Sequence, residues 1–144
     1  MKIGEVARKL GISPHTLRYY DKEGLLHFVG RNEAGVRTFT PNDMEWLHCI
    51  ECLKRCGMPL KDIRKFLDYH YQGDITIAQR LDMLNQLREQ VQKQLEMFQF
   101  QRDLLDFKIS WYTKAAAEGR TDFGLGRLLD MFKEQRARQE HESS

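Results

Sequence analysis

The apolar positions at the start of the chain follow the period of two short helices joined by a tight turn. The first helix has apolar residues three and four positions apart, which form one face: Ile3, Val6, Ala7 and Leu10. Gly11 can adopt the left-handed conformation of a turn. Ser13 and Pro14 are typical of a helix start, because Ser13 can cap free N–H groups and Pro14 needs no donor at the first position. We expect the second helix to end at Gly24.

The second helix carries the side chains that proteins use to contact nucleic acid. Its cationic, hydroxyl and aromatic residues are His15, Thr16, Arg18, Tyr19, Tyr20 and Lys22. Two helices joined by a turn of about three or four residues form a helix-turn-helix, whose second helix can lie in the major groove of DNA and hold phosphates. The alternative is a helical hairpin that buries its apolar face and contacts no partner.

A small hairpin is predicted after this pair. Phe28-Val29 and Arg37-Thr38-Phe39 are two candidate strands around a loop, residues 31–35, that contains the Asn and Gly used in hairpins. Next to a helix-turn-helix such a hairpin is a wing, and its cations Arg31 and Arg37 can reach phosphates beside the groove. A plain connecting hairpin remains the alternative.

Two further helices follow the hairpin. Thr40 as cap and Pro41 at the first position begin a helix that we expect to run to Cys56. After Pro59, a short amphipathic helix is indicated by the apolar positions Leu60, Ile63, Phe66 and Leu67. Its outer side carries Lys61, Arg64 and Lys65, which either make a second contact to a phosphate backbone or are simply solvated.

The longest predicted element runs from Ile75 to Tyr112 without Gly or Pro. Apolar residues recur every seven positions, at Ile77, Leu84, Val91, Phe98, Leu105 and Tyr112, and the position four further on reads Leu81, Arg88, Leu95, Arg102 and Ile109. This repeat is specific for a coiled coil. At about 1.5 Å per residue the helix is roughly 55–60 Å long, which is too long for the one small domain before it, residues 1–72, to cover. This N-terminal domain is called the head below. We therefore expect a homodimer, with an antiparallel crossing near Leu95.

The remainder of the chain is short. Helix-breaking residues within 113–124, namely Gly119, Thr121-Asp122 and Gly124, precede a final helix from Leu125 to about Arg138. We expect the apolar stripe of this helix to fold onto the partner or a head. The last six residues are expected to be disordered. The predicted organisation is mostly α: a winged helix-turn-helix domain over 1–72, a dimerisation helix over 73–112, and a C-terminal helix and tail over 113–144. About 30 residues after the coiled coil are too few for a separate ligand-binding domain.

Composition limits the classes of protein to consider. The 144 residues contain no run of 18 apolar residues and no signal peptide, which excludes a membrane span and favours the cytoplasm. Three cysteines, an odd number, fit free thiols in a reducing compartment. Residues 1–65 hold 12 Lys and Arg against 8 Asp and Glu, a net charge of +4, whereas the rest of the chain is at −2. The basic head favours an anionic partner, although weakly.

The three cysteines lie on one side of the third predicted helix. At about 100° per residue, the apolar arc is centred near Leu53, with Cys49 and Cys56 inside it and Cys52 at its edge, between His48 and Arg55. A thiol beside His or Arg loses its proton more easily than a buried one. Cys52 is therefore the candidate reactive thiol.

Other interpretations of the cysteines stay open. All three can be ordinary core residues, and a metal could bind His48 with Cys52 or Cys49 with Cys56, although four clear ligands are lacking. A disulfide from Cys52 to either neighbour would strain the helix. A thiol enzyme built on His48 and Cys52 would lack an orienting third group and an evident pocket.

The segments IGEVARKLGISPHTLRYYDKEGLL, VRTFTPNDMEWL and LKRCGMPLKDIRKFL, followed by a long helix, closely resemble the MerR family of bacterial transcription regulators. The resemblance runs from Met1 to about Tyr112. It implies a dimer on an inverted repeat in a promoter, where signal binding distorts the DNA so that RNA polymerase can engage it. It also implies DNA contacts by Ser13, His15, Thr16, Arg18 and Tyr19, by Arg37 in the first wing and by Lys61 in the second. Phe39 departs from the Tyr of many members, so a hydroxyl contact there is expected to be absent.

The resemblance also bears on the signal. Metal-sensing members have cysteines at and after the dimerisation helix, and no Cys follows Cys56 here, so neither a metal site nor a cofactor is expected. The arrangement of Cys52-Leu53-Lys54 and Gly57-Met58 is similar to the aldehyde- and electrophile-responsive branch, often named NmlR or AdhR-like, whose important cysteine matches Cys52. The alternative is a MerR-like repressor without a thiol sensor, regulated by a protein partner through the C-terminal helix.

Overall fold

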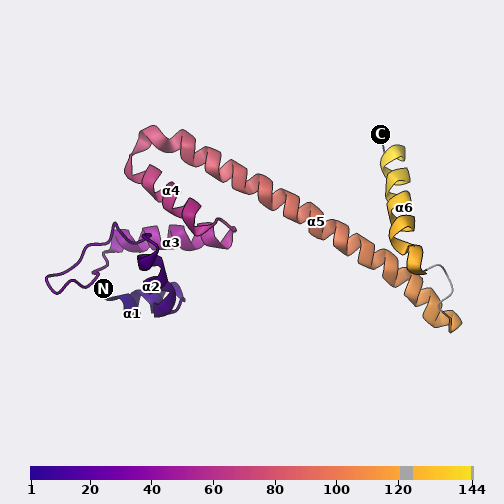
Figure 1. The fold of residues 1–144 in the computed structure, drawn as a ribbon, viewed down its shortest axis with the longest axis horizontal. Helices are drawn as coiled ribbons and strands as arrows, with labels where there is room; N and C mark the ends of the chain where they lie inside the picture. Colours follow the sequence, from indigo (N-terminus) through magenta and orange to yellow (C-terminus); the bar gives the residue numbers. More distant parts are fainter. Residues whose placement is uncertain (121–124, 144) are drawn as a thin grey trace. The chain divides into compact units, whose positions relative to one another are not determined.

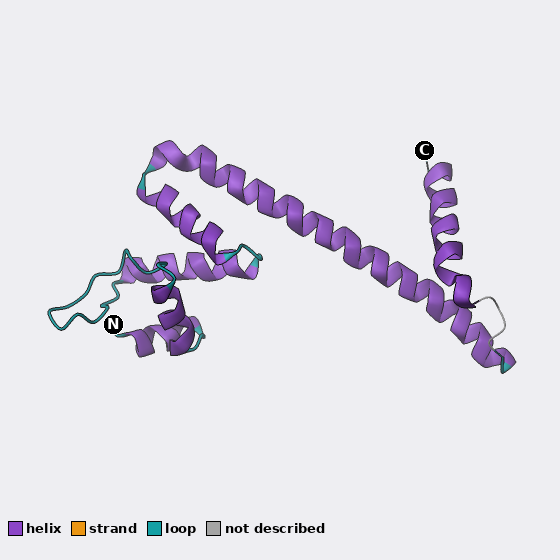
Figure 2. Cartoon of the chain, viewed as in Figure 1, coloured by secondary structure: helices purple, strands orange, loops and turns teal. Residues whose placement is uncertain are grey.

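The computed structural model describes residues 1–120 and 125–143, which form helices, turns and loops (Figures 1 and 2). The elements in chain order are α1 (Ile3–Leu10), α2 (Pro14–Lys22), α3 (Pro41–Arg55), α4 (Leu60–Tyr71), the 3-10 turn η1 (Asp74–Thr76), α5 (Ile77–Glu118), the 3-10 turn η2 (Leu125–Arg127) and α6 (Leu128–Glu142). The mostly helical fold predicted from the sequence, with a long helix and a short C-terminal helix, is confirmed.

The chain divides into two compact units, Met1–Val91 and Gln92–Ser144. The first unit has a single core to which α1, α2, α3 and α4 all contribute. Its most deeply buried side chains are Val6, Leu17, Tyr20, Leu25, Leu26, Val29, Leu47, Ile50, Ile63 and Leu67. Burial of this many aliphatic side chains is the main stabilising term for a domain of this size.

The helix starts follow from the local sequence. The Thr16 backbone N–H donates to Ser13 Oγ at 3.1 Å, which caps α2, and Pro14 occupies the first position. Thr40 and Asp43 form a reciprocal capping box at α3. Gly11 has a φ of 69°, in the left-handed region where a Cβ is strained, so the tight turn between α1 and α2 depends on this glycine.

The two strands predicted for the hairpin are wrong. Among the described residues the only β pairing is an isolated antiparallel bridge between Arg31 and Arg37. The Asn32 side chain accepts hydrogen bonds from the N–H groups of Ala34 and Val36, both at 3.0 Å, so it takes donors that a ladder would otherwise use. The wing is therefore a loop that is closed by the Asn32 side chain together with a few backbone hydrogen bonds, such as that from the Thr38 N–H to the Gly30 carbonyl at 2.9 Å.

The predicted end of the long helix is also wrong. α5 continues to Glu118, six residues beyond Tyr112, because residues 113–118 are rich in alanine and the first breaker is Gly119 with a φ of 68°. α6 likewise continues to Glu142, past the predicted end at Arg138 and into the tail expected to be disordered. The other predicted breakers, Thr121-Asp122 and Gly124, lie outside the described residues, and the three-segment division stays a prediction.

The second unit is held together by aromatic rings. Phe132 of α6 is buried, and its ring lies 5.5 Å from Phe100 and 5.6 Å from Phe107 of α5. The Arg136 guanidinium covers Phe100 at 5.2 Å. The apolar stripe of α6, expected to fold onto the partner or a head, thus packs on α5 of its own chain. In the described part of the chain, no helix has the length and apolarity needed to cross a membrane.

Candidate nucleic-acid interface

Helix α2 has two faces of opposite character. Leu17 and Tyr20, three positions apart, are buried in the core, whereas His15 and Arg18 are exposed and Tyr19 is 46% exposed. The apolar face thereby fixes the helix to α1 and α3 and leaves the cationic and aromatic face outward. Such a face is what a recognition helix presents to the major groove.

The N-terminal end of α2 carries two hydroxyl groups. Ser13 is exposed, Thr16 is half-buried, and their oxygens lie 2.9 Å apart in a hydrogen bond. Free N–H groups and a positive dipole end at this position favour a phosphate. The five residues predicted to contact DNA from this helix, namely Ser13, His15, Thr16, Arg18 and Tyr19, are therefore brought together on one end and one side of it.

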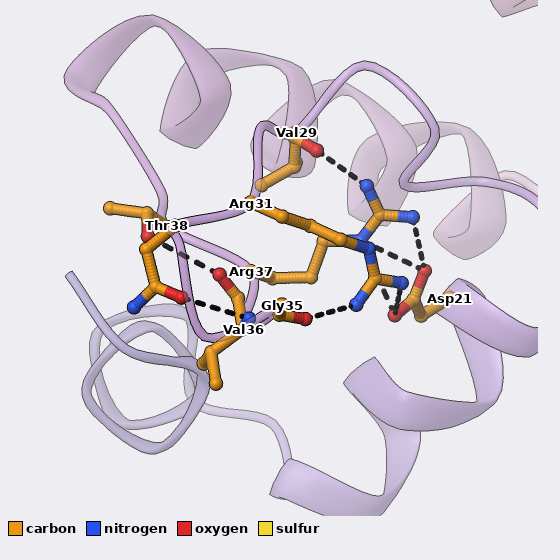
Figure 3. A network of polar contacts seen from close by, with 8 residues as sticks. Asp21, Val29, Arg31, Gly35, Val36, Arg37 and Thr38 are labelled. Atoms are coloured by element: carbon orange, nitrogen blue, oxygen red, sulfur yellow. Dashed lines mark hydrogen bonds and ion pairs between the residues drawn. The ribbon is translucent and has the colours of Figure 1, made fainter.

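The wing is tied to α2 by one carboxylate (Figure 3). The Arg37 guanidinium donates to Asp21 Oδ1 from Nη2 at 2.9 Å and from Nε at 3.3 Å, and Nη1 donates to the Val29 carbonyl. Arg31 approaches the same carboxylate at 3.8 Å and donates to the Gly35 carbonyl at 2.7 Å. Asp21 thus lies between two arginines from both sides of the wing.

The two arginines differ in how far they are available to DNA. The Arg37 side chain is 18% exposed, and its Nε, Nη1 and Nη2 each donate to a protein acceptor, whereas the Arg31 side chain is 50% exposed. A direct phosphate contact by Arg37 would compete with its bonds to Asp21. The contact predicted for Arg37 stays a prediction, and Arg31 is the more accessible cation of the wing.

Sequence reasoning missed Asp21. An acidic residue in the last turn of a helix interacts unfavourably with the helix dipole, which is the one local signal that it has a partner elsewhere. Nothing in the sequence near Asp21 identifies that partner, because Arg37 lies 16 positions away.

Helix α4 adds cations beside the end of α2. Lys61, in its first turn, is exposed, and the second backbone contact predicted for it stays a prediction. Arg64 lies against Gly24, so that a Cβ on this glycine would come within 3.3 Å of the Arg64 guanidinium carbon. Gly24 has a φ of 79°, and the turn that ends the recognition helix therefore requires glycine for its conformation.

A buried tyrosine joins α2 to α3. Tyr20 Oη donates to Glu51 Oε1 at 2.7 Å, and Lys54 Nζ donates to Tyr20 Oη at 2.7 Å. Burial raises the pKa of Tyr20, and the Glu51 carboxylate raises it further, so the phenol stays protonated as the donor. This chain of charged hydrogen bonds fixes the last turns of the recognition helix against α3.

The cysteines of α3 differ from the sequence prediction at one position. Cys52 is exposed and Cys49 half-buried, but Cys56, predicted inside the apolar arc, is exposed. The end of α3 explains the difference: the Met58 N–H bonds to the Leu53 carbonyl at 3.0 Å, and these two buried side chains close the helix end. Cys56 sits in the turn between them and faces outward.

Burial separates Cys49 from the other two thiols. It raises the pKa of the Cys49 thiol, and the neighbouring Cys52 adds to the effect, so Cys49 is a poor nucleophile at neutral pH. Across the described ranges, no group of three or more His, Cys, Asp or Glu side chains is placed to hold a metal ion. The exposed thiols are thus available for covalent chemistry.

The predicted coiled-coil positions form an exposed apolar stripe along α5. Nine of them are exposed by 40–64%: Ile77, Leu81, Leu84, Val91, Leu95, Phe98, Leu105, Ile109 and Tyr112. A single chain does not cover this stripe, and exposed apolar surface of this length marks an interaction site.

Comparison with known proteins agrees with this architecture. The family model for the MerR HTH family regulatory protein matches residues 1–70, and the model for MerR, DNA binding matches residues 44–106. The chain is 46% identical over 115 residues to an uncharacterized HTH-type transcriptional regulator of Haemophilus influenzae, covering 80% of this chain and 85% of that protein. It is 30% identical over 91 residues to the regulator AdhR of Bacillus subtilis, covering 63% and 65%.

A solved structure is similar over most of the chain. It is the crystal structure of HiNmlR, a MerR family regulator lacking the sensor domain, bound to promoter DNA. The identity is 44%, the match covers 83% of this chain and 95% of that one, and the TM-score is 0.66. Together with the recognition helix, the wing and the long helix, these matches show that the protein belongs to the MerR family of DNA-binding transcriptional regulators and is not an enzyme.

Proposed function

We propose that this MerR-type regulator binds an inverted repeat in promoter DNA as a homodimer. The observation that carries the proposal is the exposed apolar stripe of α5. Burying it against a second copy removes nine large apolar side chains from water, at about 25 cal/mol per Å². The promoter DNA in the HiNmlR structure supports the same kind of partner for this chain.

The stripe fits an antiparallel pair centred on Leu95. About that centre Leu81 meets Ile109, fourteen residues away on either side, and Leu84 and Leu105, eleven and ten residues away, face each other to within one residue. Arg88 and Arg102 flank Leu95 symmetrically, and their long side chains can carry the guanidinium groups out of the seam into water. Antiparallel pairing places the two recognition helices at opposite ends of the coiled coil, which fits an inverted repeat.

A charge at the centre of the stripe tests the dimer. Leu95→Glu places two carboxylates at the crossing point, and we expect monomers in analytical ultracentrifugation at micromolar concentration. The monomer should bind a half-site but lose the tight binding of a repeat selected by the wild-type protein from random duplexes. Gln94→Glu, next to it and outside the stripe, is the matched control. A Leu95→Glu protein that stays dimeric would overturn the proposed pairing.

We further propose that the regulator responds to aldehydes, other electrophiles or oxidants through Cys52 and thereby changes transcription by RNA polymerase. Cys52 is exposed, unlike Cys49. It follows Glu51 on α3, and Glu51 and Lys54 hold Tyr20 of the recognition helix. An adduct on this turn of α3 would thus act next to the contacts that position α2. Similarity to AdhR and HiNmlR supports a shared branch of the family.

Two serine variants test the thiol proposal. Cys52→Ser should abolish the change in promoter output caused by formaldehyde or methylglyoxal in a transcription assay with purified RNA polymerase. Cys56→Ser, which removes a thiol that is also exposed, should preserve it. Intact mass before and after exposure identifies the modified residue. A Cys52→Ser protein with unchanged induction would instead favour the repressor without a thiol sensor.

A further inference from the structure

The turn between α4 and α5 is closed by side-chain bonds to backbone carbonyls. Thr76, 2% exposed, donates its hydroxyl to the carbonyls of Tyr69 and Gly73, the latter at 2.8 Å. Arg80, in the first turns of α5, donates from Nη2 to the same Gly73 carbonyl at 3.3 Å. Gly73 has a φ of 92°, so the chain reverses direction here through a conformation that favours glycine.

Arg80 also contacts a histidine of α4. Its Nη1 lies 3.5 Å from His70 Nδ1, and because a guanidinium can only donate, Nδ1 must be unprotonated for this contact to form. Burial lowers the pKa of His70 and the Arg80 charge lowers it further, while Asp74 acts in the opposite direction. His70 is accordingly neutral at neutral pH and can accept from Arg80.

A cluster of rings continues this contact to the recognition helix. The ring of Trp46 on α3 lies 3.7 Å from that of His70. Tyr71 contacts His27 at 5.5 Å, and His27 Nδ1 is 3.0 Å from the Gly24 carbonyl at the end of α2. A continuous set of contacts therefore runs from the end of the recognition helix to the start of α5, all within the unit Met1–Val91.

Two kinds of contact hold α5 on the head, and they differ in directionality. Met83 and Leu87 of α5 pack against the head core through apolar contacts, which tolerate small rotations. The Arg80 bonds depend on distance and angle. They are long, and the buried Nε of Arg80 has no hydrogen-bond partner among the described residues. The polar contact is thus directional but weak, and a small change of free energy can break it.

We propose that Arg80, acting through His70 and Trp46, is a positioning residue that fixes the angle at which α5 leaves the head and thereby the half-site spacing that the dimer prefers. The inference rests on the proposed binding of an inverted repeat. Because the coiled coil carries one head at each end, a change of this angle moves both recognition helices along the DNA. The half-site sequence itself should be unaffected, since the residues that Arg80 contacts, His70 and Gly73, lie at the end of α4 and in the turn after it, and not on α2.

The test measures spacing preference separately from affinity. The full-length wild-type protein selects an inverted repeat from random duplexes, and fluorescence anisotropy then follows its binding to the same half-sites with spacers one or two base pairs shorter or longer. For Arg80→Gln we expect the preference for the optimal spacer to fall about threefold, the order of one weak hydrogen bond. Arg80→Lys, which keeps the charge but lacks the planar fork of the guanidinium, should be intermediate. Gln79→Ala, an exposed neighbour on α5, should match the wild type.

The outcomes separate this inference from the proposed function. Trp46→Phe keeps an apolar ring in the core and should relax the preference in the same direction, which provides a second variant if Arg80→Gln fails to fold by circular dichroism. Folded, dimeric Arg80 and Trp46 variants with the wild-type optimum and the wild-type penalty for a wrong spacer would overturn the inference alone. Failure of the wild-type protein to select any inverted repeat would overturn the proposed function and this inference with it.

Discussion

The pairing of Asp21 with Arg37 gives the sharpest prediction about the wing. The Asp21 side chain is 24% exposed and that of Arg37 18%, and two guanidinium nitrogens donate to one carboxylate oxygen at 2.9 and 3.3 Å. Hydrogen bonds to charged groups contribute about 1.5–3 kcal/mol when they are shielded from water. We expect Arg37→Gln to lower the free energy of unfolding by about 2 kcal/mol.

Arg31→Gln is the matched control for stability. Arg31 is 3.8 Å from the same carboxylate, and its side chain is half exposed, so its removal should cost about 0.5 kcal/mol or less. Urea unfolding followed by circular dichroism measures the free energy of unfolding of both variants. A double-mutant cycle of Asp21→Asn and Arg37→Gln should give an interaction energy between the two side chains of about 1.5 kcal/mol. Equal costs for the two arginine variants, or no coupling, would refute the reasoning.

The same variants decide whether Arg37 contacts DNA. If Arg37 holds the wing against α2, Asp21→Asn and Arg37→Gln both loosen the wing and both lower affinity for DNA, with the salt dependence unchanged. If Arg37 instead reaches a phosphate, Arg37→Gln reduces the slope of log K against log salt by about one. In that case Asp21→Asn frees the cation and raises affinity. We expect the first pattern.

Three further predictions follow from single features of the head. Lys61→Ala should weaken binding to all DNA sequences equally and reduce the salt slope by about one, measured by anisotropy at several salt concentrations. The pKa of His70 is lowered below its ordinary value of 6.5, so the folded protein loses stability as the pH falls below 6.5 and the unfolded chain takes up a proton at this residue. His70→Gln should remove this contribution to the pH dependence of the free energy of unfolding, measured by urea titration. Iodoacetamide should label Cys56 before Cys49 by mass spectrometry, because burial raises the pKa of Cys49, and the reverse order would contradict the assigned exposures.

The local sequence determined most of the helices and their starts. Ser13-Pro14 and Thr40-Pro41 are cap signals that act within one turn, and the structure has both. The apolar stripe of α5 could be predicted from the sequence because it depends only on the spacing of residues along one helix. The two helix ends were misplaced because alanine-rich and charged residues favour helix without marking where it stops.

Tertiary structure decided which side chains are free. Arg37 and Arg31 are equivalent in the sequence, but Asp21, 16 positions from Arg37, holds the Arg37 guanidinium and leaves Arg31 half exposed. Cys56 turns outward because Leu53 and Met58 close the end of α3. Helical periodicity repeats within one element and can be read from the chain, whereas partners far apart in sequence are chosen only when the helices pack.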